Sequence, residues 1–364
     1  MKKIIILLFV CIHVNAQFLE DSESRNQAKI GLDYLYNLEY EKAENTFETI
    51  LVKYHNHPVS YLIKATLLQW KNMPIEKHPA AFSQYISLLE KCSSSAYELY
   101  KNGFFKTEAT FYLLSSHGNI SRGYHYNNDY IKAGWEAKKA YVFLKEGLQL
   151  ADTNPDFLFT NGLFKFYRTQ YPISHPQIKP IIYFFAEGNK AEGLNDLRRA
   201  SKTALFTKTE SAFFLAGICM KYENRNAEAL TLLSKLYKNY SRNPDFLLKY
   251  TESLIANNQL DKAKEMNALL KKVKGVDYQL ASMVFGAQLT SDNREAEKIR
   301  RQALEIKGDG RYTRDIRSML FLDLGEVAYA RKDLISAKRY FKECLEIAEY
   351  TIIKKRAQGY LNKL

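Results

Sequence analysis

A glycine followed twelve residues later by an alanine is the feature that most constrains the fold of this chain. Three such pairs lie in the same pattern of apolar residues, namely Gly31 and Ala43, Gly217 and Ala229, and Gly325 and Ala337. Around each pair, large apolar residues recur at helical spacing, which predicts two amphipathic helices per copy. Small side chains at both positions let two helices approach closely. The spacing therefore predicts helical hairpins repeated near residues 24–57, 210–244 and 318–350.

The copy nearest the C-terminus has the fullest pattern. Its apolar and small positions are Phe321, Leu324, Gly325, Ala328, Leu334, Ala337, Phe341 and Cys344. This arrangement resembles the tetratricopeptide repeat (TPR), a helical hairpin of about 34 residues. The resemblance implies an all-α, TPR-like α-solenoid with about eight to ten hairpins, forming a single domain over residues 17–364.

The last residues of the chain have an amphipathic pattern of their own. In residues 350–364, Ile352, Ile353, Ala357, Tyr360 and Leu361 fall on one helical face, and Lys354, Lys355, Arg356 and Lys363 fall on the other. This pattern predicts a C-terminal helix that caps the solenoid. Contact of its basic face with a membrane is the alternative.

The middle of the chain is similar to a particular TPR family. Gly162-Leu163-Phe164 is followed by a proline-bearing loop over residues 171–180 and then by Gly193-Leu194. This order resembles the central region of the inclusion-body clearance and tetratricopeptide-39 proteins, over residues 28–240. Those proteins are interaction proteins without an established active site, so the resemblance implies a scaffold and supplies no catalytic residues. They are not exported by a signal such as the one described next.

Residues 1–16 have the composition of a signal peptide. Lys2 and Lys3 precede an apolar run over residues 4–14, and Ala16 is a small residue directly before Gln17. We expect cleavage after Ala16 and export to a periplasm or cell envelope, with secretion as the alternative. The run is too short for a membrane anchor.

The four cysteines do not form a disulfide framework. Lipid attachment at Cys11 is disfavoured because it requires small residues before the cysteine, and Phe9-Val10 precede it here. The other three, Cys92, Cys219 and Cys344, lie in helical patterns without a CxxC motif. We expect them to be buried free thiols.

Motifs for cofactors and metals are missing from the sequence. The segment Gly188–Gly193 lacks the Walker spacing, and no GxGxxG occurs. His55 and His57 have no cysteine or carboxylate at ligand spacing, so we assign them to a solvated loop and expect no metal. His117, His125 and His175 have no adjacent nucleophile and acid. We predict a protein that is not an enzyme; a site that gathers these three histidines is the alternative.

Aromatic and basic residues indicate a binding role. The chain has 26 Tyr and 21 Phe, and aromatic residues on the first helix of a TPR hairpin face the concave side of the stack, where peptides bind. Residues 262–364 contain 22 Lys and Arg against 14 Asp and Glu, within a formal net charge of +13. This excess favours an acidic protein or peptide, an anionic membrane surface or an envelope polymer. Export and the lack of a motif argue against nucleic acid.

Together these features predict an exported scaffold that binds a protein or peptide through a concave, aromatic and basic groove. The candidate partner-binding residues are Phe159, Tyr167, Lys354, Lys355 and Arg356. The alternative is a glycan-binding or ligand-binding TPR component of an envelope uptake system. Having only two tryptophans and no convincing lipid-anchor cysteine counts against it.

Overall fold

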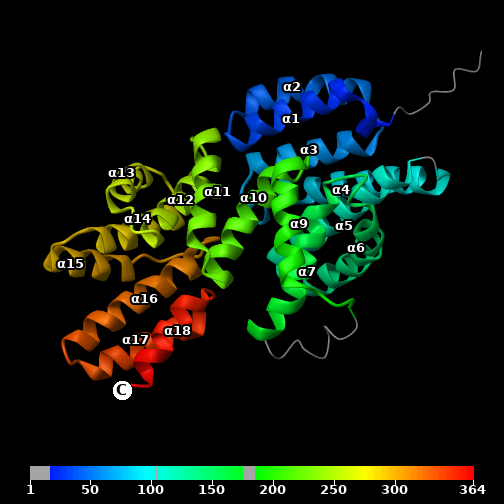
Figure 1. Ribbon diagram of the computed structural model, residues 1–364. Coiled ribbons are helices and arrows are strands. Elements are labelled where there is room, and N and C mark those ends of the chain that lie inside the picture. Colours follow the sequence, from blue (N-terminus) through cyan, green and yellow to red (C-terminus); the bar gives the residue numbers. More distant parts are fainter. Residues whose placement is uncertain (1–16, 104, 175–184) are drawn as a thin grey trace, which may run out of the picture. The chain divides into compact units, whose positions relative to one another are not determined.

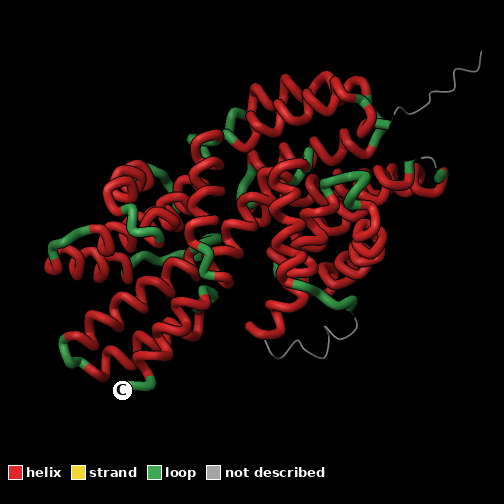
Figure 2. Tube along the Cα trace, viewed as in Figure 1, coloured by secondary structure: helices red, strands yellow, loops and turns green. Residues whose placement is uncertain are grey.

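A computed structural model describes residues 17–103, 105–174 and 185–364, and every regular element in these ranges is helical (Figures 1 and 2). The predicted all-α class is therefore confirmed. The signal peptide, Cys11 and His175 lie outside the described residues. Contacts divide the chain into two compact units, residues 1–35 with 39–157, and residues 36–38 with 158–364. Each unit has its own hairpins and core, and the single solenoid over residues 17–364 stays a prediction.

The first unit, called unit 1, contains the helices from α1 to α6, apart from the last residue of α1. They are α1 (Ser22–Tyr36), α2 (Tyr40–Lys53), α3 (Pro58–Lys71), α4 (Pro79–Asn102), α5 (Lys106–Tyr126) and α6 (Tyr130–Leu150). Local sequence sets their ends. The Asp129 carboxylate accepts the backbone N–H of Lys132 and so caps α6. Gly103 ends α4 in the left-handed conformation, with φ of 77°, which glycine adopts without a steric cost.

The second unit, called unit 2, contains α7 (Phe157–Ser174) from its second residue onward, and all the later helices. These are α9 (Lys190–Thr203), α10 (Lys208–Ile218), α11 (Asn226–Asn239), α12 (Pro244–Ala256), α13 (Leu260–Leu270), α14 (Val276–Leu289), α15 (Asn293–Leu304), α16 (Thr313–Ala330), α17 (Leu334–Ile347) and α18 (Thr351–Leu361). A single π-helical turn, η4 (Cys219–Glu223), follows α10. Side-chain oxygens of Asn189, Asn243, Asp292 and Asp333 cap four of these helices.

Consecutive helices pack as pairs. Within the described residues the pairs are α1–α2, α3–α4, α5–α6, α7–α9, α10–α11, α12–α13, α14–α15 and α16–α17. First helices of neighbouring pairs also touch, since α14 contacts both α12 and α16. The terminal helix α18 packs against α16 and α17, as expected of a capping helix. This arrangement confirms the predicted TPR-like stack of hairpins.

Two of the three glycines that predicted the repeat lie at tight helix contacts. A Cβ atom on Gly325 would lie 2.5 Å from the ring of Phe341, and one on Gly31 would collide with the ring of Phe47 in the same way. Phe47 and Phe341 are both fully buried. These rings fill the space that the missing side chains leave, which confirms the register of the first and last copies.

Gly217 does not have the role that the spacing predicts. A Cβ atom placed on it would meet nothing within 4 Å, while its neighbour Ala216 is fully buried. The π-helical turn at Cys219–Glu223 begins two residues later. Because a π turn contains an extra residue, it changes which side chains face the partner helix. The tight contact predicted at Gly217 is therefore wrong.

The C-terminal helix follows its predicted pattern with one exception. Ile353 and Ala357 are buried, and the ring of Tyr360 stacks on Phe341 at 4.9 Å. Ile352, which we placed on the buried face, is 44% exposed. The Arg356 guanidinium forms an ion pair of 2.6 Å with Glu326 on α16.

The thiols of Cys92, Cys219 and Cys344 are free and buried, as predicted. Burial raises the pKa of each thiol to about 12, so the thiolate form is suppressed. Among the described helices, none combines the length and apolar character needed to cross a bilayer.

Candidate functional site

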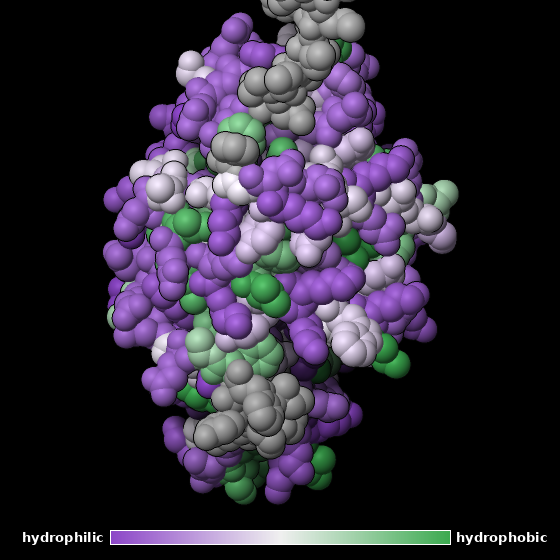
Figure 3. Space-filling view, turned by 90° about the vertical axis from the view of Figure 1, so that its right-hand side faces the viewer, coloured by the Kyte–Doolittle hydropathy of each residue, from purple (hydrophilic) through white to green (hydrophobic). Residues whose placement is uncertain are grey.

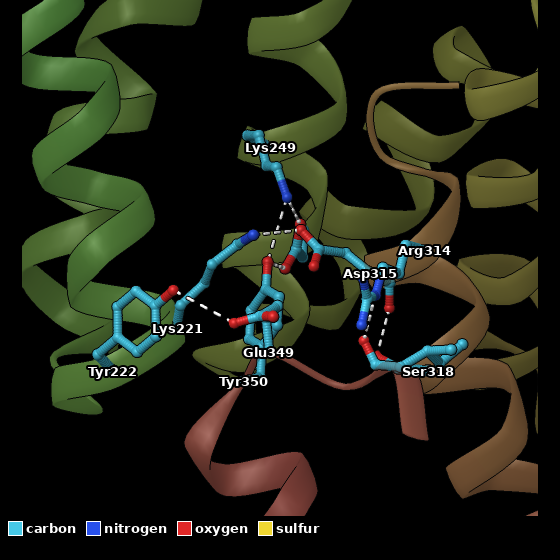
Figure 4. A network of polar contacts seen from close by, with 10 residues as sticks. Lys221, Tyr222, Lys249, Arg314, Asp315, Ser318, Glu349 and Tyr350 are labelled. Carbon is cyan, nitrogen blue, oxygen red and sulfur yellow. Dashed lines mark hydrogen bonds and ion pairs between the residues drawn. The ribbon is translucent and has the colours of Figure 1, made fainter. Parts of the chain in front are cut away.

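Four separate segments of unit 2 bring polar and aromatic side chains together (Figure 4). We call this group the unit 2 cluster. It consists of Lys221 and Tyr222 from η4, Lys249 and Glu252 from α12, Tyr312 and Asp315 at the start of α16, and Glu349 and Tyr350 directly before α18. These segments are the turn that follows α10, two helices that each begin a pair, and the residues before the capping helix. Residues that are far apart in sequence thus meet in one place.

An ion pair forms the buried part of the cluster. The Lys249 ammonium lies 2.8 Å from a Glu252 carboxylate oxygen and 3.1 Å from the Tyr350 hydroxyl, and that hydroxyl donates to Glu252. All three residues are buried. Burial lowers the pKa of Lys249, but the charges of Glu252 and Asp315 and the hydrogen bond to Glu252 together raise it by more, so the pKa lies above its usual value. Lys249 is therefore a cation inside the protein.

A second ion pair lies beside the first. Lys221 Nζ is 2.5 Å from an Asp315 carboxylate oxygen and 5.5 Å from the centre of the Tyr350 ring. The Lys249 ammonium is 5.0 Å from the centre of the Tyr312 ring. Ammonium groups over aromatic faces gain electrostatic attraction, especially where water is excluded. The Lys221 side chain keeps 25% of its surface exposed, so this pair is reachable from solvent.

Aromatic residues border the cluster. Tyr167 of α7 has its ring centre 6.1 Å from that of Tyr222, and the Tyr222 hydroxyl is 3.5 Å from Glu349. Burial raises the pKa of Tyr167 to about 12. On another side, the guanidinium of Arg311 lies over the rings of Tyr312 and Phe213, at 5.3 and 5.8 Å. The border therefore offers both apolar area and charge.

The Tyr312 hydroxyl is buried beside the Asp245 carboxylate. Burial raises the pKa of Tyr312, and the charge of Asp245 and a hydrogen bond to it raise this pKa further. The hydroxyl therefore stays protonated, as a donor beside this carboxylate.

Local structure explains how the segments are positioned. The π-helical turn places Lys221 and Tyr222, which are adjacent in sequence, both within the cluster. Asp315 lies in the first turn of α16, where the helix dipole favours a carboxylate. Arg314 donates to the carbonyls of Ile347 and Glu346 at 3.1 and 3.4 Å, which fixes the start of α16 against the end of α17.

The residues predicted for partner binding fall in different places. Tyr167 borders the cluster, whereas Phe159 packs against Phe214 with ring centres 5.5 Å apart. Lys354, Lys355 and Arg356 lie on α18, where Lys354 is half-buried, Lys355 is exposed and Arg356 pairs with Glu326. Their part in binding stays a prediction.

Sequence reasoning missed the buried pair Lys249 and Glu252. A signal was present, since Lys249 directly follows the apolar run Phe246-Leu247-Leu248. Its position three residues before Glu252 also suits an ion pair on one helix. The third member, Tyr350, is a hundred residues away and no local pattern links it to the pair.

The histidines have separate surroundings. His117 lies 2.6 Å from Glu136 and stacks on Phe143, while His125 is exposed and contacts the rings of Tyr126 and Tyr130. His175 lies outside the described residues. Within the ranges that the structure describes, no group of three His, Cys, Asp or Glu residues could hold a metal ion.

His57 corrects the sequence-based assignment to a solvated loop. Its side chain is buried, and its Nδ1 accepts the backbone N–H of Val59 at 3.2 Å. Pro58 starts α3 as the first helical residue, so His57 is the N-cap and its ring lies against the helix rather than in solvent.

The comparisons with known proteins add little to this description. No protein-family model matches the chain, and no curated protein sequence matches it. Among solved structures, the crystal structure of yeast Tom70 is similar with a TM-score of 0.39 and 17% identity, covering 83% of this chain and 63% of that chain. This chain thus spans less than two thirds of the length of that structure. The TPR-like architecture therefore rests on the helix pairs and glycine contacts of the chain itself.

Proposed function

We propose that this protein is an exported, non-enzymatic helical scaffold that binds an extended segment of an acidic protein or peptide at the unit 2 cluster. The observation that carries the proposal is the buried pair of Lys249 and Glu252 with the Tyr350 hydroxyl. Stacking of hairpins needs only apolar contacts, and burying two charges costs free energy of solvation. A polar cluster built from four segments is therefore better explained by recognition than by packing.

The border of the cluster suits a peptide. Lys221 and Arg311 keep 25% and 45% of their side-chain surfaces exposed while pairing with Asp315 and Asp245. Either cation can exchange its carboxylate for one from a partner. Tyr167 and Tyr222 supply apolar area beside these charges.

Other parts of the proposal come from the sequence. Export depends on residues 1–16, and N-terminal sequencing of the mature protein should find Gln17 first. Preference for an acidic partner depends on the basic excess of residues 262–364, to which Lys354 and Lys355 contribute. The inclusion-body clearance family, the concave groove and the roles of Phe159 and Arg356 are further parts of the same proposal.

Site-specific photocrosslinking in the native host tests the binding site. A photoreactive phenylalanine replaces Tyr167 at the border of the cluster or, as the control, Tyr237 on α11, which is half-buried and stacks on Tyr250. We expect a defined crosslinked protein at position 167 and none at 237. Lys221→Met should reduce the yield, and Lys235→Met, an exposed change on α11, should not. Equal yields of crosslinked partner at positions 167 and 237 would refute binding at the cluster. So would a yield at position 167 that Lys221→Met does not change.

A further inference from the structure

The outward face of α6 in unit 1 carries apolar side chains that the fold does not use. Ile131, Trp135 and Val142 are 77%, 61% and 47% exposed. They are spaced four and seven residues apart, so they lie on one side of the helix, and Lys138 and Lys145 fall on the same side. We call these five residues the α6 face. Large apolar side chains exposed together usually mark a contact surface.

The acidic residues of α6 are turned the other way. Within Tyr130–Leu150 the only carboxylates are Glu136 and Glu146. Glu136 bonds to His117 on α5 at 2.6 Å, and Glu146 accepts from Tyr100 and Thr110 at 2.6 and 3.3 Å. Both carboxylates are thus engaged by α4 and α5, which leaves the α6 face with positive charge and no acid.

The two lysines of the α6 face lie over aromatic rings. Lys138 Nζ is 5.5 Å from the centre of the Trp135 ring, and Lys145 Nζ is 5.4 Å from that of Tyr141. Long lysine stems can lie along apolar surface while the ammonium groups remain in water. Trp135, the largest apolar residue of the face, therefore has a cation beside it.

A shallow groove between α5 and α6 extends this surface. It has a volume of about 490 Å³, and its lining includes Gly118 and Gly134, where a Cβ atom would meet nothing within 4 Å. Tyr126 and Tyr130 line it as well and are exposed. Figure 3 views the molecule from the side where α4, α5 and α6 lie in Figure 1, and apolar residues there are surrounded by hydrophilic ones.

We propose that the α6 face docks unit 1 on the surface of an anionic lipid bilayer. Tryptophan and tyrosine rings are favourable at the level of lipid headgroups, and lysines beside them are attracted to anionic lipids. Shallow insertion needs no matching shape, which suits three separate apolar side chains. A second copy of the chain fits less well, since it would bring Lys138 and Lys145 near the same lysines. The proposal does not depend on the function of the unit 2 cluster.

Vesicle binding tests this proposal directly because Trp135 is one of only two tryptophans. In a Trp70→Phe background, fluorescence of Trp135 reports on the α6 face alone. We expect a blue shift and co-sedimentation with vesicles of phosphatidylcholine and phosphatidylglycerol, and neither with phosphatidylcholine alone. Added salt should weaken the binding.

Two double variants with the same change of charge locate the contact. Lys138→Glu with Lys145→Glu should lower vesicle binding by about tenfold or more, because each basic residue near an anionic surface adds attraction. Lys235→Glu with Lys238→Glu, two exposed positions on α11, is the matched control and should leave it unchanged. Ile131→Ser with Val142→Ser should also weaken binding without changing net charge. Circular dichroism confirms that each variant is folded.

Several results would overturn the proposal. They are no sedimentation with anionic vesicles, a blue shift that is the same with phosphatidylcholine alone, or an equal loss in the α6 and α11 variants. Binding of soluble polyglutamate without binding of vesicles would also overturn it, in favour of an acidic protein as the occupant.

Discussion

The two units each bury a glutamate, and the surroundings of these two residues are opposite. Glu108 in unit 1 is 0% exposed, and Glu252 in unit 2 is 4% exposed. Glu252 has an ammonium group at 2.8 Å and a phenol hydroxyl that donates to it. Glu108 also has a phenol hydroxyl beside it, that of Tyr112, but its other neighbours are the backbone N–H of Leu19 at 3.4 Å and the His57 Nε2 at 3.5 Å, with no ammonium group.

The difference shows in the charge of each group. Burial raises the pKa of Glu108 to about 7 and lowers that of His57 to about 4. Between these values both groups are largely neutral, so their contact is not an ion pair there. In unit 2, Lys249 stays charged because the carboxylates of Glu252 and Asp315 together outweigh the effect of burial. Equal burial therefore gives a neutral pair or an ionic one, depending on the partner.

The largest expected effect comes from removing the partner in unit 2. Lys249→Met leaves the Glu252 carboxylate buried without its cation and should lower the free energy of unfolding by about 3–5 kcal/mol. Denaturant titration of the purified protein measures the loss. The double variant Lys249→Met with Glu252→Leu should regain much of it, because no charge is then left uncompensated. A single variant as stable as the wild type would mean that the pair is not buried.

In unit 1, replacing the buried acid by its neutral amide, Glu108→Gln, should stabilise the protein by an amount that depends on pH. The folded pKa of Glu108, about 7, exceeds its ordinary value of 4.5, so folding becomes less favourable as pH rises from 4.5 to 7. Glu108→Gln removes this penalty. We expect a gain of roughly 3 kcal/mol in the free energy of unfolding at pH 8 and almost none at pH 4.

Unfolding curves of both proteins across this pH range supply the measurement. His57 also changes the free energy of unfolding at low pH, but it does so in the wild type and in Glu108→Gln alike, so its effect cancels in the difference between them. A gain that does not depend on pH would show that ionisation of Glu108 is not the cause.

A smaller effect should be the same in both units, since the glycine contacts are alike. Gly31→Ala and Gly325→Ala each force a Cβ atom against a buried phenylalanine ring and should cost about 1–3 kcal/mol. Gly217→Ala is the matched control, because its Cβ atom enters open space, and it should stabilise α10 by roughly 0.5–1 kcal/mol. Thermal unfolding ranks the three variants. Equal effects at all three positions would contradict the packing described here.

What the sequence could predict depends on how far apart the contacting residues are. Gly325 and Phe341 lie on adjacent helices of one hairpin, so a fixed spacing reveals their contact. Gly217 has the same spacing, but the π-helical turn after it changes the register, and no periodic pattern marks that turn. Tyr350 contacts Lys249 across 101 residues of sequence, a distance over which spacing carries no information. The fold was therefore predictable, and the cluster was not.

Tyr350 also changes what should be expected of the end of the chain. Terminal helices usually fray, and their amide hydrogens exchange quickly with solvent. Here the residue directly before α18 is buried and bonded to both Lys249 and Glu252. Fraying of α18 back to its first turn would open the cluster and expose the ion pair to water. Slow amide exchange across Thr351–Leu361 is thus linked to an intact cluster. A partner bound near Lys221 would therefore protect the amides of α18 from exchange without touching that helix.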